Sequence, residues 1–250
     1  MTKSQINKLG EKLRTALELD AETLSQLQEF RASYDEPMFR AQTRLREVGL
    51  EATSRLKTIN TIIEKLRRER TRLAEMQDIG GLRIVSEVDL TGQDMIVSRI
   101  VDTFPVTRVI DRRRSPNYGY RAVHVIASLG ERRIEIQVRT QLQDFWAQAM
   151  ERLADEAGRE IRYGGAPQAR SEDVESLQNL AHDIADAEVM LTKLNQMETG
   201  LPQPRRAARM QRELRLHIAR IQSLRAELRE RDETIRAILE AIMARGGASR

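Results

Sequence analysis

Two acidic side chains stand beside short apolar segments that are typical of buried strands. Asp78 lies just before the run GLRIV, and Glu135 lies in the middle of the alternating segment RRIEIQVRT. Because side chains alternate between the two faces of a strand, Glu135 shares its face with other polar residues. This polar face comprises Arg133, Glu135, Gln137 and Arg139. A row of catalytic side chains would show this alternation, and so would a solvated sheet face with charge pairs.

Paired carboxylates and nearby cations are the groups that transfer of a phosphoryl or pyrophosphoryl group requires. Such a reaction needs positive charge along the phosphate chain and an acceptor in line with the bond that breaks. Two carboxylates suffice for a magnesium ion that keeps part of its water and binds nucleotide oxygens. Asp78 and Glu135 are therefore the candidate metal-binding and catalytic residues. The candidate phosphate-binding and base-stacking cations are Arg55, Lys57, Lys65 and Arg83.

The segment NYGYRAVH combines a turn with an emerging strand. Asn117 and Gly119 are turn formers, and Tyr120 and His124 alternate along the strand. An exposed tyrosine at the mouth of a strand is a platform on which a purine can stack. A tyrosine packed in the core and a buried structural histidine are the competing interpretations. The preceding basic triplet, Arg112–Arg114, either neutralises acceptor phosphates or is a solvated loop.

Several other catalytic classes lack their parts in this sequence. There is no GxxxxGK[ST] loop, no GxGxxG after a strand and no Ser-His-Asp arrangement with a nucleophile elbow. The sequence has no cysteine, which excludes disulfides, thiolate metal sites and cysteine nucleophiles. Two of the three histidines, His182 and His217, fall on expected helices, so a histidine-rich metal site is not expected. The dipeptide His182-Asp183 is interpreted as a pair on a helix surface.

The residues that precede these motifs are predicted to be helical. About the first 75 residues carry apolar stripes at helical spacing, of which Ile6, Leu9 and Leu13 form the first. Asp20 is a plausible N-cap between the first two helices. Apolar residues recur again at helical spacing over Leu56–Leu66, within a segment rich in arginine and lysine. We interpret that segment as part of a basic helix that carries Arg55, Lys57 and Lys65.

Residues 78–140 change to short β-branched runs separated by turn residues, which predicts a small sheet core of the α/β or α+β type. The predicted strands are Gly81–Val85, Val106–Ile110, Tyr120–Ser128 and Arg132–Val138. Gly130 and its neighbours predict that the last two strands form a hairpin. The stretch Gly92–Phe104 is predicted to be an intervening helix. The two candidate acids thus lie at or within strands of one sheet.

Helices return after the predicted sheet. The first begins near Gln141, and its apolar face comprises Phe145, Trp146, Met150 and Leu153. A second is predicted over Ser171–Met197 and is expected to end at Gly200 and Pro202. The last runs from about Arg205 to Arg245 with apolar residues near heptad spacing. We interpret it as a packing or oligomerisation helix rather than as a long coiled coil.

The composition favours helices and anionic ligands. Of 250 residues, 4% are aromatic and 32% are charged, a balance typical of long helices with much surface. The net charge of +4 comes from abundant arginine, which suits phosphate-bearing ligands, with a solvated helical surface as the alternative. The sequence contains no signal-peptide-like or bilayer-length apolar run, so we expect a cytoplasmic protein without a membrane partner.

Four segments in this order and spacing resemble the synthetase domain of the RelA/SpoT family, especially its stand-alone small alarmone synthetases: DIGGLRIV, NYGYRAVH, IEIQVRT and DFWAQAMERL. The opening segment SQINKLGEKLR is similar to the N-terminal helix of that small class. The resemblance implies an α+β fold for residues 1–160, in which a nucleotidyltransferase-like mixed sheet is flanked by helices, and a helical extension over residues 161–250. The family's reaction transfers the β,γ-pyrophosphate of ATP to the 3′-hydroxyl of GDP or GTP and releases AMP and (p)ppGpp.

The resemblance also implies roles for the candidate residues on the ATP side. Asp78 and Glu135 resemble the acids that bind Mg²⁺, with Glu135 also as the base that takes the 3′-hydroxyl proton. The residues that match the family's ATP-binding positions are Arg55, Lys57, Lys65 and Arg83. Among them, Arg55 matches the arginine that stacks on adenine, and the lysines match those that meet the phosphates.

On the acceptor side, Tyr120 resembles the tyrosine that stacks on the guanine. The other residues expected at the acceptor and its phosphates are Arg112, Asn117, His124 and Gln137. The sequence departs from the small synthetases at Arg152, which follows Glu151 where they often have histidine. No hydrolase domain is recognised, so degradation of the product is not expected. A homo-oligomer, a tetramer by resemblance, is expected through the terminal helices.

Two other functions fit the same motifs. The first is a toxic synthetase-like enzyme that transfers pyrophosphate to the 3′ end of tRNA or to adenine nucleotides, with the basic residues at 112–114 and in the last helix contacting RNA phosphates. The second is a catalytically inactive nucleotide sensor or scaffold. Against the second, binding alone would not require both Asp78 and Glu135.

Overall fold

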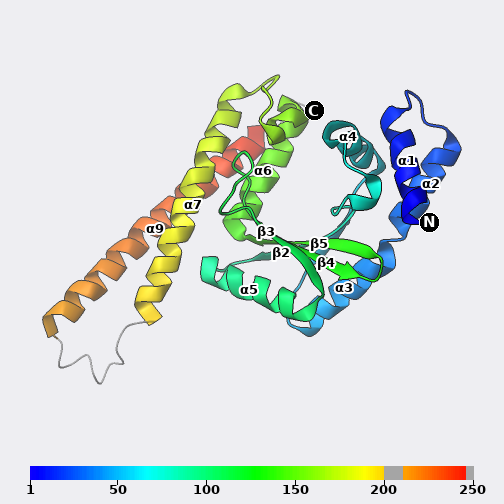
Figure 1. Cartoon of the computed structure of the whole chain (residues 1–250). Helices are drawn as coiled ribbons and strands as arrows, with labels where there is room; N and C mark the ends of the chain where they lie inside the picture. Colours follow the sequence, from blue (N-terminus) through cyan, green and yellow to red (C-terminus); the bar gives the residue numbers. More distant parts are fainter. Residues whose placement is uncertain (200–210, 246–250) are drawn as a thin grey trace. The chain divides into compact units, whose positions relative to one another are not determined.

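The computed structural model describes residues 1–199 and 211–245, which form two compact units (Figure 1). The first unit comprises Met1–Val85, Met95–Ile110 and Val123–Val138. The second unit comprises Ser86–Asp94, Asp111–Ala122 and the described part of Arg139–Arg250. The helix end predicted at Gly200 and Pro202 and the helix start predicted near Arg205 lie outside the described residues.

The first unit opens with three helices, α1 (Lys3–Thr15), α2 (Ala21–Ala32) and α3 (Asp35–Glu47). The predicted stripe of α1 is confirmed, because Ile6, Leu9 and Leu13 are all buried. The predicted cap of α2 is also confirmed. The Asp20 carboxylate accepts a hydrogen bond of 2.6 Å from the backbone N–H of Thr23, which satisfies one of the amide groups left open at a helix start.

A five-stranded mixed sheet forms the centre of the first unit, in the order β1-β2-β5-β4-β3. Its strands are β1 (Thr53–Leu56), β2 (Gly80–Ser86), β3 (Val106–Asp111), β4 (Val123–Leu129) and β5 (Arg132–Thr140). The predicted hairpin is confirmed, since β4 and β5 pair antiparallel with His124 opposite Gln137 and Ile126 opposite Glu135. The third strand begins at Val123, three residues later than Tyr120, where the sequence pattern placed its start.

The strand β1 corrects the sequence-based prediction that the first 75 residues are all helical. Its four residues pair antiparallel with β2, with Arg55 opposite Gly81 and Leu56 opposite Gly80. Leu56 was counted with the helical stripe, but the helix α4 begins only at Ile59. A four-residue segment is too short to show a period, so its pairing with a distant strand decides its conformation.

Helices cover both sides of the sheet within the first unit (Figure 1). α4 (Ile59–Glu69) lies on one side and α5 (Leu90–Thr103) on the other, with the short helix η1 (Leu73–Glu75) leading into β2. Thr58 caps the N-terminus of α4, since its hydroxyl accepts from the N–H of Thr61 at 3.3 Å, and α4 buries Ile62, Ile63 and Leu66. Lys65 lies beside this apolar face, and its ammonium group contacts Asp78 just before β2.

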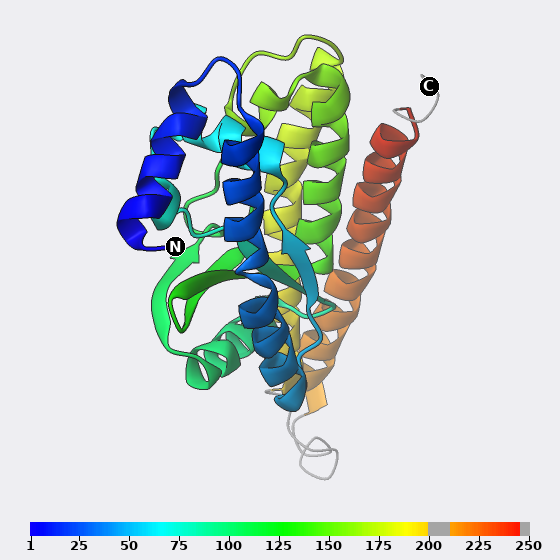
Figure 2. The same ribbon diagram turned by 90° about the vertical axis from the view of Figure 1, so that its right-hand side faces the viewer.

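Three helices form the body of the second unit: α6 (Gln141–Ala157), α7 (Ser171–Thr199) and α9 (Gln211–Arg245), with η2 (Arg159–Tyr163) after α6. Figure 2 shows the three long helices side by side. Their shared core includes Trp146, whose indole N–H donates to the carbonyl of Leu177 at 2.6 Å, together with Ile235 and Leu239 of α9. None of the helices within 1–199 and 211–245 combines the length and the apolarity that a bilayer crossing requires.

Candidate active site

The carboxylate of Asp78 is the centre of a cluster of charges at the start of β2. Its Oδ2 accepts hydrogen bonds from the ammonium groups of Lys57, at 2.6 Å, and Lys65, at 2.9 Å. Lys57 lies in the connection between β1 and α4, where its backbone N–H donates to the carbonyl of Ile79 at 2.8 Å. The prediction of one basic helix is therefore wrong in part. Only Lys65 lies on a helix, whereas Arg55 lies on β1.

Asp78 is ionised and has one oxygen open to a further cation. Burial by itself would raise the pKa of Asp78, but the charges and hydrogen bonds of Lys57 and Lys65 outweigh it and hold the pKa below its ordinary value. Its Oδ1 is buried and has no hydrogen-bond partner among the described residues. A buried carboxylate oxygen without a donor is costly to leave, and a metal ion or ordered water is the kind of group that satisfies it.

Glu135, on β5, is the second acid, and its exposed fraction is 9%. Its Oε1 accepts from Nδ1 of His124 at 2.7 Å, and its Oε2 accepts from the side-chain amide of Gln137 at 3.0 Å. Burial would raise the pKa of Glu135, but the hydrogen bond and charge of His124 outweigh it and lower the pKa. The nearby Asp78 carboxylate acts against this lowering. Both acids are thus carboxylates near neutral pH.

These two acids fit a magnesium ion that the protein holds by few ligands. No group of three or more His, Cys, Asp or Glu side chains suited to a metal occurs among residues 1–199 and 211–245. Mg²⁺ in nucleotide enzymes usually needs only one or two carboxylates, because substrate phosphates and water complete its shell. β2 and β5 are neighbours, and a Cβ placed on Gly81 would lie 3.7 Å from the carbonyl oxygen of Glu135. The open Oδ1 of Asp78 would be one ligand of such an ion.

Two arginines lie on one face of the β1–β2 ladder. Arg55 is opposite Gly81, and Arg83 is opposite Thr53, so the arginines are diagonal neighbours. Diagonal side chains on one face are about 7–8 Å apart at their attachment points, within reach of long side chains. Because Gly81 has no side chain, the position opposite Arg55 adds no bulk between the two guanidinium groups. This arrangement suits a flat ring stacked between two cations.

The predicted acceptor residues divide between the two units. His124 and Gln137 lie in the first unit, where both contact Glu135. The other three, Arg112, Asn117 and Tyr120, lie in the second unit.

The predicted turn at Asn117 and Gly119 is confirmed. The N–H of Asn117 donates to the carbonyl of Tyr120 at 3.2 Å, and the reverse bond is 3.0 Å long. The intervening Tyr118 and Gly119 have φ values of 51° and 91°. Positive φ at both central positions is the signature of a type I′ hairpin turn, and glycine takes the second position without strain.

Tyr120 is half-buried rather than exposed, which corrects the sequence-based interpretation. Its hydroxyl accepts from Nη2 of Arg139 at 3.1 Å, and the Arg139 guanidinium lies 5.1 Å from the centre of its ring. Arg139 is itself 3% exposed and forms an ion pair of 2.8 Å with Asp144. Two residues of the polar face predicted for β5, Glu135 and Arg139, are thus buried. Their charged or polar partners offset the cost of removing them from water.

Sequence reasoning missed the partners of several basic residues. It interpreted Arg112–Arg114 as one flexible patch, but Arg113 has a side chain only 16% exposed and pairs with Asp94 and Asp111. Arg114 is 89% exposed. Sequence reasoning also placed Lys57 and Lys65 at phosphates and did not predict their contact with Asp78. The interpretation of His182-Asp183 as a surface pair is confirmed, since both residues are exposed on α7.

Comparison with known proteins finds likeness in the same part of the chain. The model of the region found in RelA / SpoT proteins matches residues 54–154. Uncharacterised proteins of Mycobacterium bovis and Mycobacterium tuberculosis are 41% identical over 143 residues, which cover 55% of this chain and 52% of theirs. The chain thus spans about half the length of the curated relatives it matches.

Solved structures share the fold. Small alarmone synthetase 1 from Bacillus subtilis superposes with a TM-score of 0.55 and 23% identity, over 68% of this chain and 98% of that one. The same protein bound to its product pppGpp gives a TM-score of 0.54 at 23% identity, over 68% and 97%. A GTP pyrophosphokinase family protein from Streptococcus pneumoniae gives 0.51 at 21% identity, over 74% and 100%. At these identities the likeness is one of fold.

Proposed function

We propose that the protein is a GTP/GDP pyrophosphokinase, because residues 54–154 match the model of the region found in RelA / SpoT proteins. It would transfer the β,γ-pyrophosphate of ATP to the 3′-hydroxyl of GDP or GTP, with AMP and (p)ppGpp as products. The single observation that carries this proposal is the pair of ionised acids, of which the Asp78 charge acts on Glu135. Asp78 has an open oxygen and two lysines beside it, and Glu135 is oriented by His124 and Gln137.

The ATP side of the reaction is assigned to the edge of the sheet around Asp78. Arg55 and Arg83 hold the adenine between their guanidinium groups, and Lys57 and Lys65 bind the phosphates. Both lysines contact the same carboxylate oxygen of Asp78, at 2.6 and 2.9 Å, and its single negative charge leaves the three groups net positive. Phosphate oxygens can replace that carboxylate as lysine partners, which releases Asp78 for the metal.

Asp78 and Glu135 are assigned as the magnesium-binding residues. A magnesium ion bound there supplies positive charge that offsets the charge developing on the transferred group. Glu135 also serves as the base for the 3′-hydroxyl proton. The contact of His124 Nδ1 with Glu135 Oε1 at 2.7 Å holds the Glu135 carboxylate in one orientation, which suits a base that must meet a positioned hydroxyl.

For the acceptor, the roles are assigned within each unit by itself. In the second unit Tyr120 stacks on the guanine and Arg112 and Asn117 contact the acceptor's phosphates; in the first unit His124 and Gln137 serve the acceptor beside the Glu135 base. The contact between Tyr120 and Arg139 supports the role of Tyr120, because it fixes the ring plane before a base arrives.

Exposed apolar side chains on the long helices support a second proposal, that α7 and α9 mediate self-association in a homo-oligomer. These side chains are Val189, Leu216, Ile218 and Ile238.

The test is incubation with γ-labelled ATP and magnesium beside GDP, GTP, ADP or bulk tRNA, followed by separation of labelled products. Label on a guanine nucleotide that disappears in Glu135→Gln supports the proposal. Label on tRNA or ADP alone would identify the toxic type of enzyme. No label on any acceptor, with ATP still bound, would identify a nucleotide sensor or scaffold and refute the proposal.

A further inference from the structure

Residues 111–122, here called the 111–122 loop, connect β3 and β4 and carry three of the proposed acceptor-binding residues. The backbone bonds of the loop form a short ladder. The N–H of Arg112 donates to the carbonyl of Ala122 at 2.9 Å, and Asn117 and Tyr120 exchange two bonds at the tip. A two-stranded ladder of this length is marginally stable by itself. Other contacts must therefore hold the loop in place.

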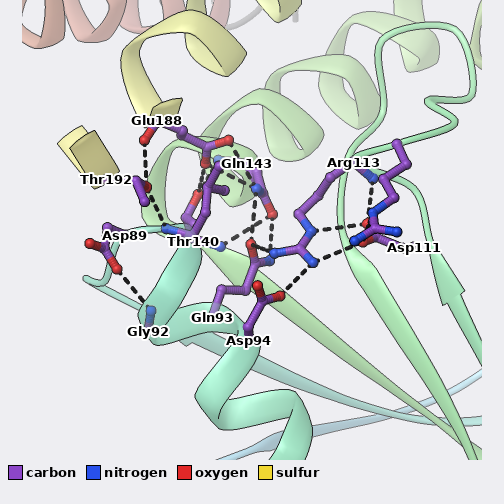
Figure 3. A network of polar contacts seen from close by, with 12 residues as sticks. Asp89, Gly92, Gln93, Asp94, Asp111, Arg113, Thr140, Gln143, Glu188 and Thr192 are labelled. Atoms are coloured by element: carbon purple, nitrogen blue, oxygen red, sulfur yellow. Dashed lines mark hydrogen bonds and ion pairs between the residues drawn. The ribbon is translucent and has the colours of Figure 1, made fainter. Parts of the chain in front are cut away.

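Arg113 supplies the main polar contact of the loop with α5 (Figure 3). Its Nε and Nη2 donate to the Asp111 carboxylate at 2.9 and 2.8 Å, Nη2 also donates to Asp94 at 2.6 Å, and Nη1 donates to Oε1 of Gln93 at 3.2 Å. Two carboxylates thus neutralise this guanidinium, and most of its donors are engaged. Arg113 is consequently a poor phosphate ligand, and its contacts instead hold the loop against Gln93 and Asp94 of α5.

The hydrogen-bond network continues from α5 to α7 through a chain of buried side chains. Gln93 is 0% exposed, Gln143 2% and Glu188 5%. The amide of Gln93 donates to Gln143 at 2.9 Å, and the amide of Gln143 donates to Glu188 at 3.0 Å. The hydroxyl of Thr140 also donates to Glu188. The shorter bonds of this chain run from the Arg113 cation toward the Glu188 carboxyl group, and the Gln143 amide also donates a longer bond of 3.4 Å back to Oε1 of Gln93. The two glutamines therefore fix each other's orientation.

We propose that Arg113 is a positioning residue for acceptor binding and that Glu188 of α7 is its remote anchor. The proposal rests on the pyrophosphokinase function proposed above, because it concerns the loop that carries Arg112, Asn117 and Tyr120. Glu188 lies outside the matched region 54–154, so α7 becomes part of the support of the acceptor site. A separate contact, from Arg121 to the carbonyl of Ala181 at 2.7 Å, keeps the loop attached to α7 when the chain of side chains is broken.

The test compares steady-state kinetics of Arg113→Ala and Arg114→Ala. Both substitutions remove one positive charge from adjacent residues, but the Arg114 side chain is 89% exposed and its contact with Asp111 is 3.5 Å long. Arg113→Ala is expected to raise the KM for the acceptor about ten-fold, with the KM for ATP changed less than about two-fold. Arg114→Ala is expected to change neither KM by more than about two-fold.

Variants at the far end of the chain separate positioning from direct contact. Glu188→Leu is expected to raise the acceptor KM as Arg113→Ala does, and the double variant is expected to be no worse than either, because both break one network. Glu188→Gln can accept from Gln143 and donate to Thr140, so it is expected to rescue the KM. An acceptor KM that responds to Arg113→Ala but not to Glu188→Leu would assign Arg113 to direct contact. Equal changes in both KM values would reduce the network to a purely structural role. Either result overturns the proposal.

If no acceptor receives label, that result would refute the proposed function alone. Hydrogen exchange of the protein without nucleotides then tests whether Arg113 and Glu188 position the 111–122 loop. The amides of Arg112, Asn117 and Tyr120 are bonded within the loop. They are expected to exchange faster in Arg113→Ala and Glu188→Leu than in the wild type and in Arg114→Ala. Unchanged exchange of these three amides in both variants would overturn the positioning role.

Discussion

Replacement of Lys65 by methionine tests the charge cluster around Asp78. The substitution keeps most of the side-chain stem but removes the ammonium group that lies 2.9 Å from Asp78. The exposed fractions of the two side chains are 22% and 21%. Breaking a fully buried ion pair costs about 3–5 kcal/mol, whereas an exposed pair contributes about 0–1 kcal/mol. Because the pair is partly exposed and Lys57 still contacts Asp78, we expect a loss of about 1–2 kcal/mol in the free energy of unfolding.

The loss depends on pH in a direction that the pKa shift of Asp78 fixes. Despite its burial, Asp78 has a lowered pKa in the folded state, because Lys57 and Lys65 stabilise its charge. A carboxyl group with a lowered folded-state pKa contributes stability above its unfolded pKa and loses it as the pH falls through the folded pKa. The difference between the wild type and Lys65→Met is therefore expected to be full at pH 7 and to shrink as the pH falls below about 4.

The assay is urea unfolding followed by circular dichroism at a series of pH values, with Arg40→Met as the matched control. Arg40 forms an exposed pair of 2.8 Å with Glu36 on α3, so its replacement is expected to cost about 0.3–0.5 kcal/mol at most. Equal stability of Lys65→Met and the wild type at pH 7 would refute the reasoning. A difference that persists undiminished at acid pH would also refute it, because it would not arise from the Asp78 charge.

Three further predictions follow from the site and the loop. Glu135→Gln is expected to lower kcat at least about 100-fold while the Kd for ATP, measured by calorimetry, changes little, since the substitution removes the base and a metal ligand but keeps the shape; normal turnover would exclude Glu135 as the base. Tyr120→Ala is expected to raise the acceptor KM far more than the KM for ATP, and equal effects in the same kinetic assay would remove Tyr120 from the acceptor site. Gly119→Ala is expected to cost about 1–3 kcal/mol in thermal unfolding, because φ is 91° and the new Cβ would lie 2.7 Å from Trp146 and 3.0 Å from Ala181; an unchanged Tm would show that the turn relaxes freely.

The local pattern of the sequence determined the elements and which residues share a face. The cap at Asp20 could be predicted because the bond it makes spans three residues. The hairpin of β4 and β5 followed from alternation and from Gly130, and it placed Glu135 in mid-strand. The motif segments also indicated which acids and bases to consider, since phosphoryl transfer requires those residue types.

The tertiary structure decided which charged groups meet. Lys57 and Lys65 are 21 and 13 residues from Asp78, and the side chain of Arg113 reaches Gln93 across 20 residues. The buried chain then joins Gln93 to Gln143 across 50 residues and Gln143 to Glu188 across 45. Periodicity reports only the next few residues along an element, whereas ion pairs and buried hydrogen bonds depend on which distant elements pack together. The pairing of β1 with β2 was hidden for the same reason, because four residues show no period until a partner strand orders them.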